Sequence, residues 1–281
     1  MGAARAGVRR IILLTLGWEE LPKSVSVYGD TSGERLREPV PGILLEVDGG
    51  FVLLDTGLNP ALITDAPLCR RFHGENHGIH AVLPGPGEPL EEALAAVGVD
   101  LADIGAVAVS HLHNDHAGGL RHFAGVAPSV PVHIQHAELE YGLSEHPGPE
   151  RHGMFRIDYD DPRIEWRVHD GDVEIAPGVT AVRSPGHTPG HQSFVVDVDA
   201  SAGGGGFVFA FDAADLTENI EEEVAVGGFI DCAPEDTIES IRRLKAIAAE
   251  RGYPVVPGHD PDVWPKLTDE LAARWPVRHE H

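Results

Sequence analysis

The chain has 281 residues, 42% of them hydrophobic, so it is long enough to bury a sizeable core and fits neither a disordered nor a fibrous protein. Its 45 Asp and Glu residues outnumber its 21 Lys and Arg residues, and the formal net charge of −24 argues against nucleic acid and anionic membranes as partners. No apolar stretch approaches the roughly 20 residues of a spanning helix, and Cys69 and Cys232 form no disulfide framework, so we expect a soluble cytoplasmic protein.

The first part of the chain alternates short apolar runs with Gly and Pro. Three runs predict strands, the middle one a hairpin around residues 48–50: residues 8–16, 42–57 and 106–111. Residues 89–99 predict a helix ending near Gly98, because Pro stands at its start and acidic residues fill its first turn. Residues 67–89 show no clear periodicity and are expected to form a long loop.

The second part predicts four more strands and a long helix. The strands are residues 131–135, 178–186, 191–200 and 206–215, with the glycine-rich segment 201–206 as a hairpin tip. Residues 233–252 predict the clearest helix, because apolar residues recur at helical spacing and Gly252 stands at its end. Strands and helices in two successive blocks indicate two packed sheets with helices outside.

A cluster of metal-binding residue types follows the third predicted strand. Residues 110–119 read SHLHNDHAGG and place four potential ligands within six positions: His111, His113, Asp115 and His116. In extended backbone the two imidazoles of a His-x-His pair point to the same side and can reach one metal ion. The carboxylate and imidazole that follow can serve a second ion. A polar turn is the alternative in a chain with 17 histidines, but four ligands this close together favour metal binding.

Two metal ions need further ligands, and three other predicted strand ends offer them. The candidates are His187 and His191, Asp212 and Asp215, and His259 and Asp260. Each set has a structural alternative: His191 can hydrogen-bond a ligand from behind, Asp215 can cap a turn, and Asp260 can be a solvated loop residue. None of these segments is persuasive by itself.

In combination, the order of these residues resembles the metallo-β-lactamase superfamily over residues 40–265. The superfamily's pattern is met by His111, His113, Asp115, His116, His187, Asp212 and His259. Within the superfamily the chain is most similar to N-acyl-homoserine lactonases, on VPGILLEVDGGFVLLDTG, SHLHNDHAGG, HDGDVEIAPGVTAVRSPGHTPGHQS, ENIEEEVAVGGF and SIRRLK. The resemblance implies an α/β (α+β) fold, an αββα sandwich of two packed mixed β-sheets with helices outside, as a single domain over residues 1–281.

The resemblance also implies the roles of the ligands. It assigns His111, His113 and His187 to one ion, Asp115, His116 and His259 to the other, and Asp212 to a bridge between them. Asp55, in the segment LLDTG, would support the metal loop without binding metal. Two divalent ions are implied, with zinc first and cobalt, manganese or iron open. The implied reaction is attack of a metal-bridging hydroxide on a lactone carbonyl, with Asp115 passing the proton to the ring oxygen.

Two departures from the lactonases concern the substrate. Many of them have a tyrosine at the position of Asp215, and often an apolar residue at that of Asn114. An ionised Asp215 cannot donate a hydrogen bond to an oxyanion, so it would recognise a basic substrate group or cap a turn. Tyr159 or Tyr141 would then be candidates to enter the pocket from another loop, with His191 behind the ligands. These departures favour a lactone more polar than a long-chain acyl-homoserine lactone.

Other functions stay open. A thioesterase or glyoxalase-type hydrolase would use the same ligands, although the acidic chain disfavours an anionic carrier. An amide or ester metallohydrolase of the superfamily is equally compatible with the motif. A non-enzymatic metal-binding module would need only the cluster near His111. We expect a small-molecule lactone or ester as the partner, and the resemblance leaves a homodimer open, with residues 66–90 as a contact.

Overall fold

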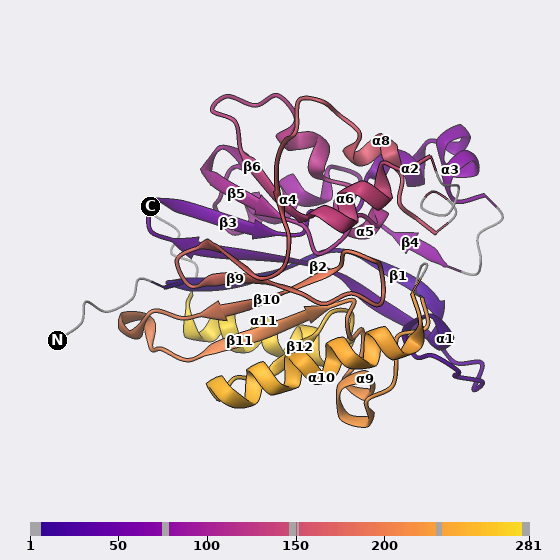
Figure 1. The fold of residues 1–281 in the computed structure, drawn as a ribbon. Coiled ribbons are helices and arrows are strands. Elements are labelled where there is room, and N and C mark those ends of the chain that lie inside the picture. The colour runs from indigo at the N-terminus through magenta and orange to yellow at the C-terminus, as the bar shows by residue number, and fades with distance from the viewer. Residues whose placement is uncertain (1–6, 75–78, 146–149, 151, 229–231, 277–281) are drawn as a thin grey trace.

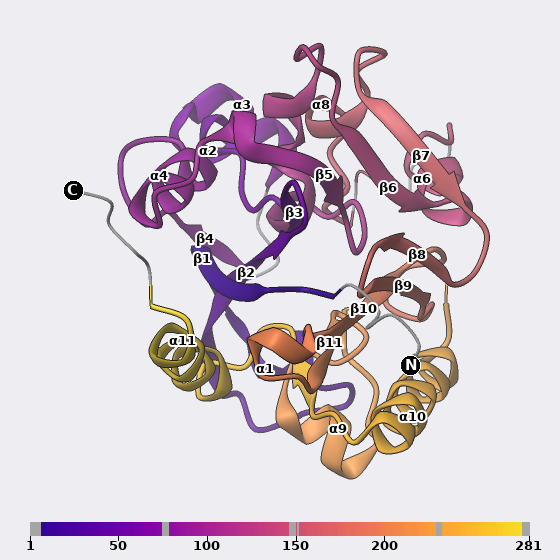
Figure 2. The ribbon, with the colours of Figure 1, turned by 90° about the vertical axis from the view of Figure 1, so that its left-hand side faces the viewer.

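The computed structural model describes residues 7–74, 79–145, 150, 152–228 and 232–276. In this part of the chain two β-sheets lie face to face between two layers of helices (Figure 1). The view turned by 90° shows the same four layers, with α10 and α11 on one outer side and α4 and α8 on the other (Figure 2). The predicted sandwich of two sheets with helices outside is therefore confirmed.

The first sheet has seven strands among the described residues, in the order β4-β1-β2-β3-β5-β6-β7. β1 pairs antiparallel with β2 and β4, whereas β3, β5, β6 and β7 are parallel neighbours, so the sheet is mixed. The bounds are β1 Arg10–Pro22, β2 Arg35–Val47, β3 Gly50–Leu54, β4 His80–Val82, β5 Ile104–Ala108, β6 Pro131–Gln135 and β7 Glu165–His169.

The second sheet has the order β12-β11-β10-β9-β8, and here the one parallel pair within the described residues is β11 with β12. Its bounds are β8 Val173–Ala176, β9 Val179–Arg183, β10 Gln192–Asp197, β11 Gly206–Phe211 and β12 Val255–Pro257.

Helices cover the outer faces of both sheets. Those in the layer of the first sheet are α2 Pro60–Thr64, α3 Ala66–Phe72, α4 Pro89–Ala96, α5 Asn114–Ala117, α6 His136–Gly142 and α8 Arg156–Tyr159. Those in the layer of the second sheet are α9 Thr217–Glu222, α10 Pro234–Arg251 and α11 Val263–Arg274, and α1 Lys23–Ser26 follows β1. In the described part of the chain no helix is both long and apolar enough to cross a membrane.

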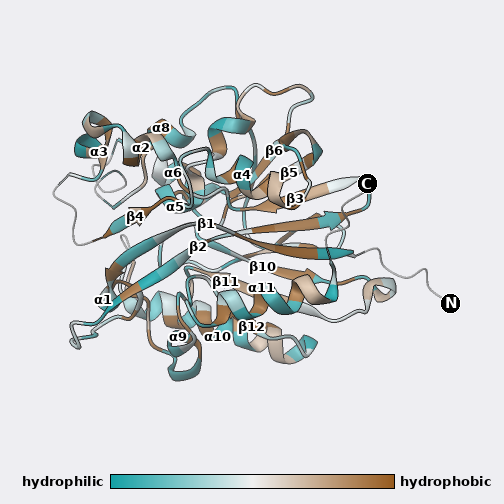
Figure 3. Cartoon of the chain, turned by 180° about the vertical axis from the view of Figure 1, so that it is seen from behind, coloured by the Kyte–Doolittle hydropathy of each residue, from teal (hydrophilic) through white to brown (hydrophobic). Residues whose placement is uncertain are grey.

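The core explains why residues 40–45 of β2 are apolar. Leu44 packs against the layer of helices above the first sheet, and Ile43 and Leu45 pack between the two sheets. A strand that is buried on both faces carries apolar residues at successive positions. Figure 3 shows the contrast with the outer helices, since α10 and α11 mix hydrophilic and hydrophobic residues along their length.

Two predicted elements agree closely with the structure. The hairpin over residues 42–57 is confirmed as β2 and β3, which pair antiparallel with Val47 opposite Gly50. The long helix is confirmed as α10, and its C-cap Gly252 has the left-handed φ of 69° that favours glycine.

The stretch 67–89 is not the loop that we expected. The side chain of Asp65 caps α3, because its Oδ1 accepts a 3.0 Å hydrogen bond from the amide of Leu68. Residues His80–Val82 form β4, which pairs with β1 over three residues, and a strand this short carries no recognisable periodicity. The strands β7 and β8 were likewise not predicted.

Candidate metal centre

The candidate ligands stand on loops that leave the same edge of the two sheets. β3 and β5 are parallel neighbours, so Asp55 and the segment 109–117 leave the first sheet side by side. β11 and β12 are also parallel, so Asp212 and His259 follow neighbouring strand ends in the second sheet. His187 lies on the connection from β9 to β10. In open α/β sheets, the carboxyl ends of parallel strands form such ligand sites.

The first group of ligand atoms contains three imidazoles and one carboxylate. Nε2 of His187 lies 3.1 Å from Nε2 of His111 and 2.8 Å from Nδ1 of His113. Oδ2 of Asp212 lies 3.4 Å from the same nitrogen of His187 and 3.8 Å from Nε2 of His111. The four residues thus point one donor atom each at a common centre, with these atoms within 4.8 Å of one another.

The second group contains Asp115, His116 and His259. Nε2 of His116 lies 3.0 Å from Oδ2 of Asp115, and Nε2 of His259 lies 4.0 Å from the same oxygen. The other oxygen of Asp212, Oδ1, lies 3.2 Å from Nε2 of His116 and 3.1 Å from Nε2 of His259. Asp212 therefore presents one carboxylate oxygen to each group.

The donor set fits a pair of divalent metal ions. Tetrahedral ions with bonds of about 2.0–2.2 Å place their ligand atoms about 3.3–3.6 Å apart, close to the spacing in both groups. Nε2 of His116 is buried and has no hydrogen-bond partner, although it lies among carboxylates. Imidazole and carboxylate are the ligands that zinc and similar ions accept. The geometry thus agrees with the ligand set that the sequence resemblance implied.

Electrostatics divides the histidines into two sets. Burial lowers the pKa of His111 and His187 well below its ordinary value and that of His113 to about 4, so these rings are neutral and ready to bind metal. Burial acts in the same direction on His116 and His259. There it is outweighed by the nearby carboxylates, chiefly Asp115 for His116 and Asp212 for His259, and the pKa of both rises well above its ordinary value. The second group therefore favours a positive charge.

Hydrogen bonds behind the rings aim their free nitrogens at the centre. Nδ1 of His116 lies 2.6 Å from Oδ2 of Asp55, and Nδ1 of His259 lies 2.9 Å from the carbonyl of Pro39. Nδ1 of His111 lies 2.9 Å from Oγ of Ser110. Each contact occupies Nδ1 and directs Nε2 at the ligand group. These partners therefore favour the tautomer that has its proton on Nδ1 and can bind metal through Nε2. Asp55 contacts His116 on the side of the ring away from the ligand group.

Glu138 is a supporting residue that sequence reasoning missed. Its buried carboxylate accepts hydrogen bonds from the amide of Leu112 at 3.0 Å, Oγ1 of Thr188 at 2.7 Å and the amide of Gly190 at 3.1 Å. Leu112 stands between two ligands and Thr188 follows His187, so one side chain ties both loops of the first group together. No pattern marks it, because it lies in the first turn of a short helix, α6, distant in sequence from every ligand.

Glycines let the backbone segments approach behind the site. A Cβ on Gly118 would lie 2.3 Å from the amide nitrogen of Asn59, and one on Gly119 would lie 2.5 Å from the carbonyl of Thr56. A Cβ on Gly190 would lie 2.0 Å from the amide nitrogen of Glu138. Only glycine fits these positions without a backbone shift.

The remaining predicted residues lie in different places. His191 is buried behind the first group, its ring centroid 5.3 Å from that of His111 and its Nδ1 3.1 Å from the carbonyl of Ser184. Asn114 is the first residue of α5, and its backbone N–H donates a 2.9 Å hydrogen bond to the carbonyl of Gly153.

Tyr159 and Asp260 use their polar atoms in hydrogen bonds outside the two ligand groups. The structure places Tyr159 in the core under the outer helices, where its hydroxyl donates to the carbonyl of Gly142 at 2.9 Å, so it offers no donor to the ligand groups. Asp260 is not a ligand, because its Oδ2 accepts from the amide and hydroxyl of Thr217 at 2.9 and 2.6 Å.

Asp215 lies at the centre itself. One of its carboxylate oxygens is within 4.8 Å of donor atoms of Asp212 and His259, while its buried Oδ1 has no hydrogen-bond partner. Burial raises its pKa well above the ordinary value, and the neighbouring charge of Asp212 adds to this.

Glu19 and Glu38 also adjoin the second group, and sequence reasoning missed both. Burial raises the pKa of Glu19 to about 8, with the charge of Asp115 adding to this, and burial raises the pKa of Glu38 to about 7 against the influence of His259. The polar segment WEELP around Glu19 reads as surface in the sequence.

Comparison with known proteins agrees with this geometry. Residues 37–259 match the model of the metallo-beta-lactamase superfamily. The chain is 33% identical over 238 residues to the N-acyl homoserine lactonase AttM of Azorhizobium caulinodans, a match that covers 82% of this chain and 84% of that protein. It is 32% identical over 232 residues to the N-acyl homoserine lactonase AiiA of Bacillus thuringiensis subsp. kurstaki, with the same coverage.

A solved structure of an N-acyl homoserine lactone hydrolase, with the product N-hexanoyl-L-homoserine bound at its catalytic metal center, superposes with a TM-score of 0.78. The match has 29% identity and covers 91% of this chain and 95% of that one. The fold, the order of the candidate ligand residues along the chain and these matches agree. The chain belongs to the metallo-beta-lactamase superfamily.

Proposed function

We propose that the protein is a dinuclear metal hydrolase that opens the ring of a lactone, either an N-acyl-homoserine lactone or a related, more polar lactone. The observation that carries the proposal is the position of Asp212, whose two carboxylate oxygens face two separate groups of buried ligands. Because one chain supplies ligands for two adjacent ions, the arrangement favours a two-metal hydrolase over a protein that only binds a single ion. Zinc is the metal that we propose, because the imidazole and carboxylate donors suit it.

The relatives support the choice of substrate. Both AttM and AiiA are N-acyl homoserine lactonases, and they match this chain over 82% of its length. The structural neighbour holds a ring-opened N-acyl homoserine at its metal center. We therefore place lactones ahead of thioesters and amides as substrates of this chain.

The chain's own residues supply proton transfer and orientation. Bound divalent ions supply Lewis acidity and make water more acidic. The pKa of Asp115 is about 2, because burial, which alone would raise it, is outweighed chiefly by the adjacent His116. An ionised Asp115 can accept a proton from the attacking water and pass it to the departing ring oxygen. Asp55 keeps His116 oriented during this transfer through its 2.6 Å contact.

Mass spectrometry tests the proposal directly. The metal-loaded protein is incubated with N-hexanoyl-homoserine lactone beside a His111→Ala/His116→Ala variant and a control variant, His136→Ala, whose side chain is 56% exposed and pairs with Glu140. We expect the lactone to gain one water with the unaltered protein and the control, and to stay unchanged with the double variant. An unchanged lactone with all three proteins, at full metal content, would contradict the proposed substrate.

A further inference from the structure

The bridging residue Asp212 directly follows a strained residue. Phe211, the last residue of β11, has a left-handed φ of 48°, which bulky side chains rarely adopt. Its side chain is buried, and its ring meets that of Phe194 edge-on with the centroids 5.5 Å apart, so the ring is held in the core while the backbone turns. Strain of this kind persists only where the surrounding structure holds it in place. The position of Asp212 therefore depends on the contacts of residues 211–217, which we call the β11 turn.

The loop after β12 lies directly against the β11 turn. The backbone N–H groups of Gly258 and His259 donate 2.9 Å hydrogen bonds to the carbonyls of Ala214 and Asp215. A Cβ on Gly258 would lie 2.8 Å from the carbonyl carbon of Phe211, so the two backbones are in close contact. The ligands that these two loops carry therefore depend on one pair of adjoining backbone segments.

The side chain of Asp260 joins the two loops. Its Oδ2 accepts hydrogen bonds from the backbone N–H and the hydroxyl of Thr217, the first residue of α9, at 2.9 and 2.6 Å. Its Oδ1 accepts from the backbone N–H groups of Asp262 and Val263, at the start of α11, at 2.9 and 3.0 Å. A backbone N–H can only donate, so both carboxyl oxygens must act as acceptors. One side chain thus connects the first turns of two helices.

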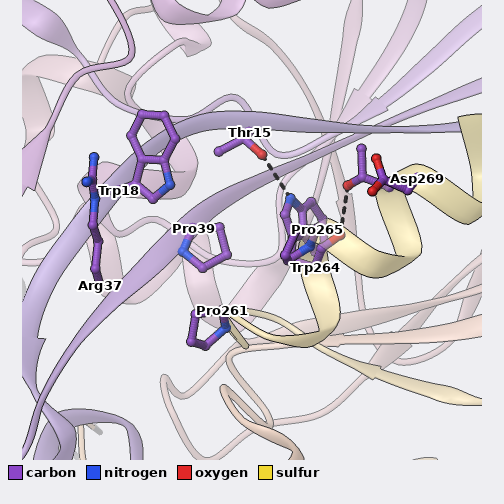
Figure 4. Close-up of a pocket in the computed structure, with 9 residues that line it drawn as sticks. Thr15, Trp18, Arg37, Pro39, Pro261, Trp264, Pro265 and Asp269 are labelled. Atoms are coloured by element: carbon purple, nitrogen blue, oxygen red, sulfur yellow. Dashed lines mark hydrogen bonds between the residues drawn. The ribbon is translucent and has the colours of Figure 1, made fainter.

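The helix α11 gives Asp260 a fixed support. Trp264 is 2% exposed, and its backbone N–H donates a 3.0 Å hydrogen bond to the carbonyl of Asp260. Its indole Nε1 donates to Oγ1 of Thr15 in β1 at 3.2 Å, a bond that Figure 4 shows where α11 meets the first sheet. Leu271 of the same helix packs in the core between the sheets. Asp260 therefore links the β11 turn to a helix that is itself fixed to β1.

We propose that Asp260 is a positioning residue for the second ligand group, whose hydrogen bonds keep Asp212 and His259 at the spacing that the second ion needs. The inference rests on the two-metal centre of the proposed function. Oδ1 of Asp212 lies 3.1 Å from Nε2 of His259, so the two loops that Asp260 joins meet at these two donor atoms. Asp260 does for the second group what Glu138 does for the first.

A metal titration with matched variants tests the proposal. In D260N the side-chain NH2 group must face either the backbone N–H of Thr217 or those at the start of α11, so at least one hydrogen bond is lost. T217V replaces only the hydroxyl and leaves every backbone donor in place. The control D262N makes the same change of group at the exposed Asp262, whose side chain does not cap α11.

The metal-free proteins are titrated with cobalt, and the absorption spectrum records the binding to each group. The step of the second group is assigned by its loss in H259A. We expect D260N to weaken this step by about 10- to 100-fold and to change its spectrum, while the step of the first group stays within about twofold. T217V should weaken the same step by a smaller factor, about threefold or more, and D262N should change neither step.

Urea denaturation of the metal-free proteins separates positioning from a general loss of stability, which would weaken both steps alike. Equal weakening of the two steps in D260N, or two unchanged steps, would overturn the inference. If D260N does not fold, T217V decides in its place, and two unchanged steps in T217V would overturn the inference. The titration needs no substrate, so it still decides the role of Asp260 if no lactone is hydrolysed and the proposed function fails.

Discussion

The carboxylate of Asp55 holds the ring of His116 from behind, with Oδ2 2.6 Å from Nδ1. The same carboxylate accepts hydrogen bonds from the amide and hydroxyl of Ser110 at 2.6 and 2.7 Å. Because Asp55 accepts at every contact, Nδ1 of His116 carries a proton, so in the neutral, metal-binding ring the lone pair is on Nε2. One buried carboxylate thereby determines the tautomer of a ligand on another loop.

An Asp55→Asn variant tests this relationship. The amide can place an N–H group against Nδ1, which moves the ring proton to Nε2 and removes the lone pair from the second group. Asn also tolerates the left-handed φ of 59° at this position, so the backbone is retained. We expect metal affinity of the second group to fall about 10- to 100-fold, measured as metal content after dialysis. The control Asp48→Asn, at an exposed side chain, should retain the content of the unaltered protein.

A Glu138→Gln variant should weaken the first group instead. The side-chain NH2 group of the glutamine would face another donor, the backbone N–H of either Gly190 or Leu112. One hydrogen bond is then lost, and the two loops are no longer held by one side chain. We expect E138Q to bind metal more weakly although the Asp55–His116 pair is intact. The absorption spectrum of the cobalt-loaded variant should differ both from that of the unaltered protein and from that of D55N. Full metal affinity in E138Q would show that Glu138 does not position the ligands.

Asp212 should affect both groups, whereas His187 should affect one. Removing the carboxylate in D212A takes an oxygen away from each group, and H187A takes one nitrogen from the first group. We expect D212A to lose most bound metal and H187A to retain about half, by elemental analysis of dialysed protein. Equal metal content in the two variants would contradict the bridging position of Asp212.

Asp158 should make stability depend on pH. It is 2% exposed, and burial raises its pKa to about 7 although Asn59 donates a hydrogen bond to it. The folded protein keeps the proton up to about pH 7, whereas the unfolded chain loses it near the ordinary aspartate pKa of 3.8. Unfolding therefore releases a proton between these limits, so the contribution of Asp158 to stability falls as pH rises through this window.

Substituting Asp158 by Asn removes that titration. We expect the free energy of unfolding of D158N, relative to the unaltered protein, to increase by roughly 2–4 kcal/mol between pH 4 and pH 8. Urea denaturation of both proteins at each pH measures the difference between their free energies of unfolding. Because both proteins lose metal at low pH, the effect of this loss largely cancels in the difference. A constant difference across this range would show that folding does not raise the pKa of Asp158.

Gly118 should tolerate no larger residue. Its φ is −61°, so the constraint is space: a Cβ would lie 2.3 Å from the amide nitrogen of Asn59 and 2.6 Å from the carbonyl of Gly57. We expect Gly118→Ala to cost about 2 kcal/mol or more in urea denaturation and to lower metal content, because α5 must move. The control Gly105→Ala, whose Cβ would lie 3.7 Å from its nearest neighbour, should leave metal content unchanged.

Much of the fold followed from local patterns. The hairpin of β2 and β3 has a glycine-rich turn between apolar runs, and α10 has helical spacing with Gly252 at its end. Both depend on neighbours in the chain, so a sequence reading can find them. β4 could not be found in this way, because its three residues form a strand only through pairing with β1.

The sequence by itself determined the order and chemistry of the ligands, because four of them share residues 111–116 and the others follow apolar strands that end in polar residues. Only the tertiary structure decided which carboxylates meet them. Glu19 faces Glu38 because of the register of β1 and β2, and Glu138 joins two loops that are far apart along the chain. Tyr159 is in the core because its hydroxyl finds a backbone carbonyl there. Such contacts depend on packing between distant segments, which local sequence patterns do not encode.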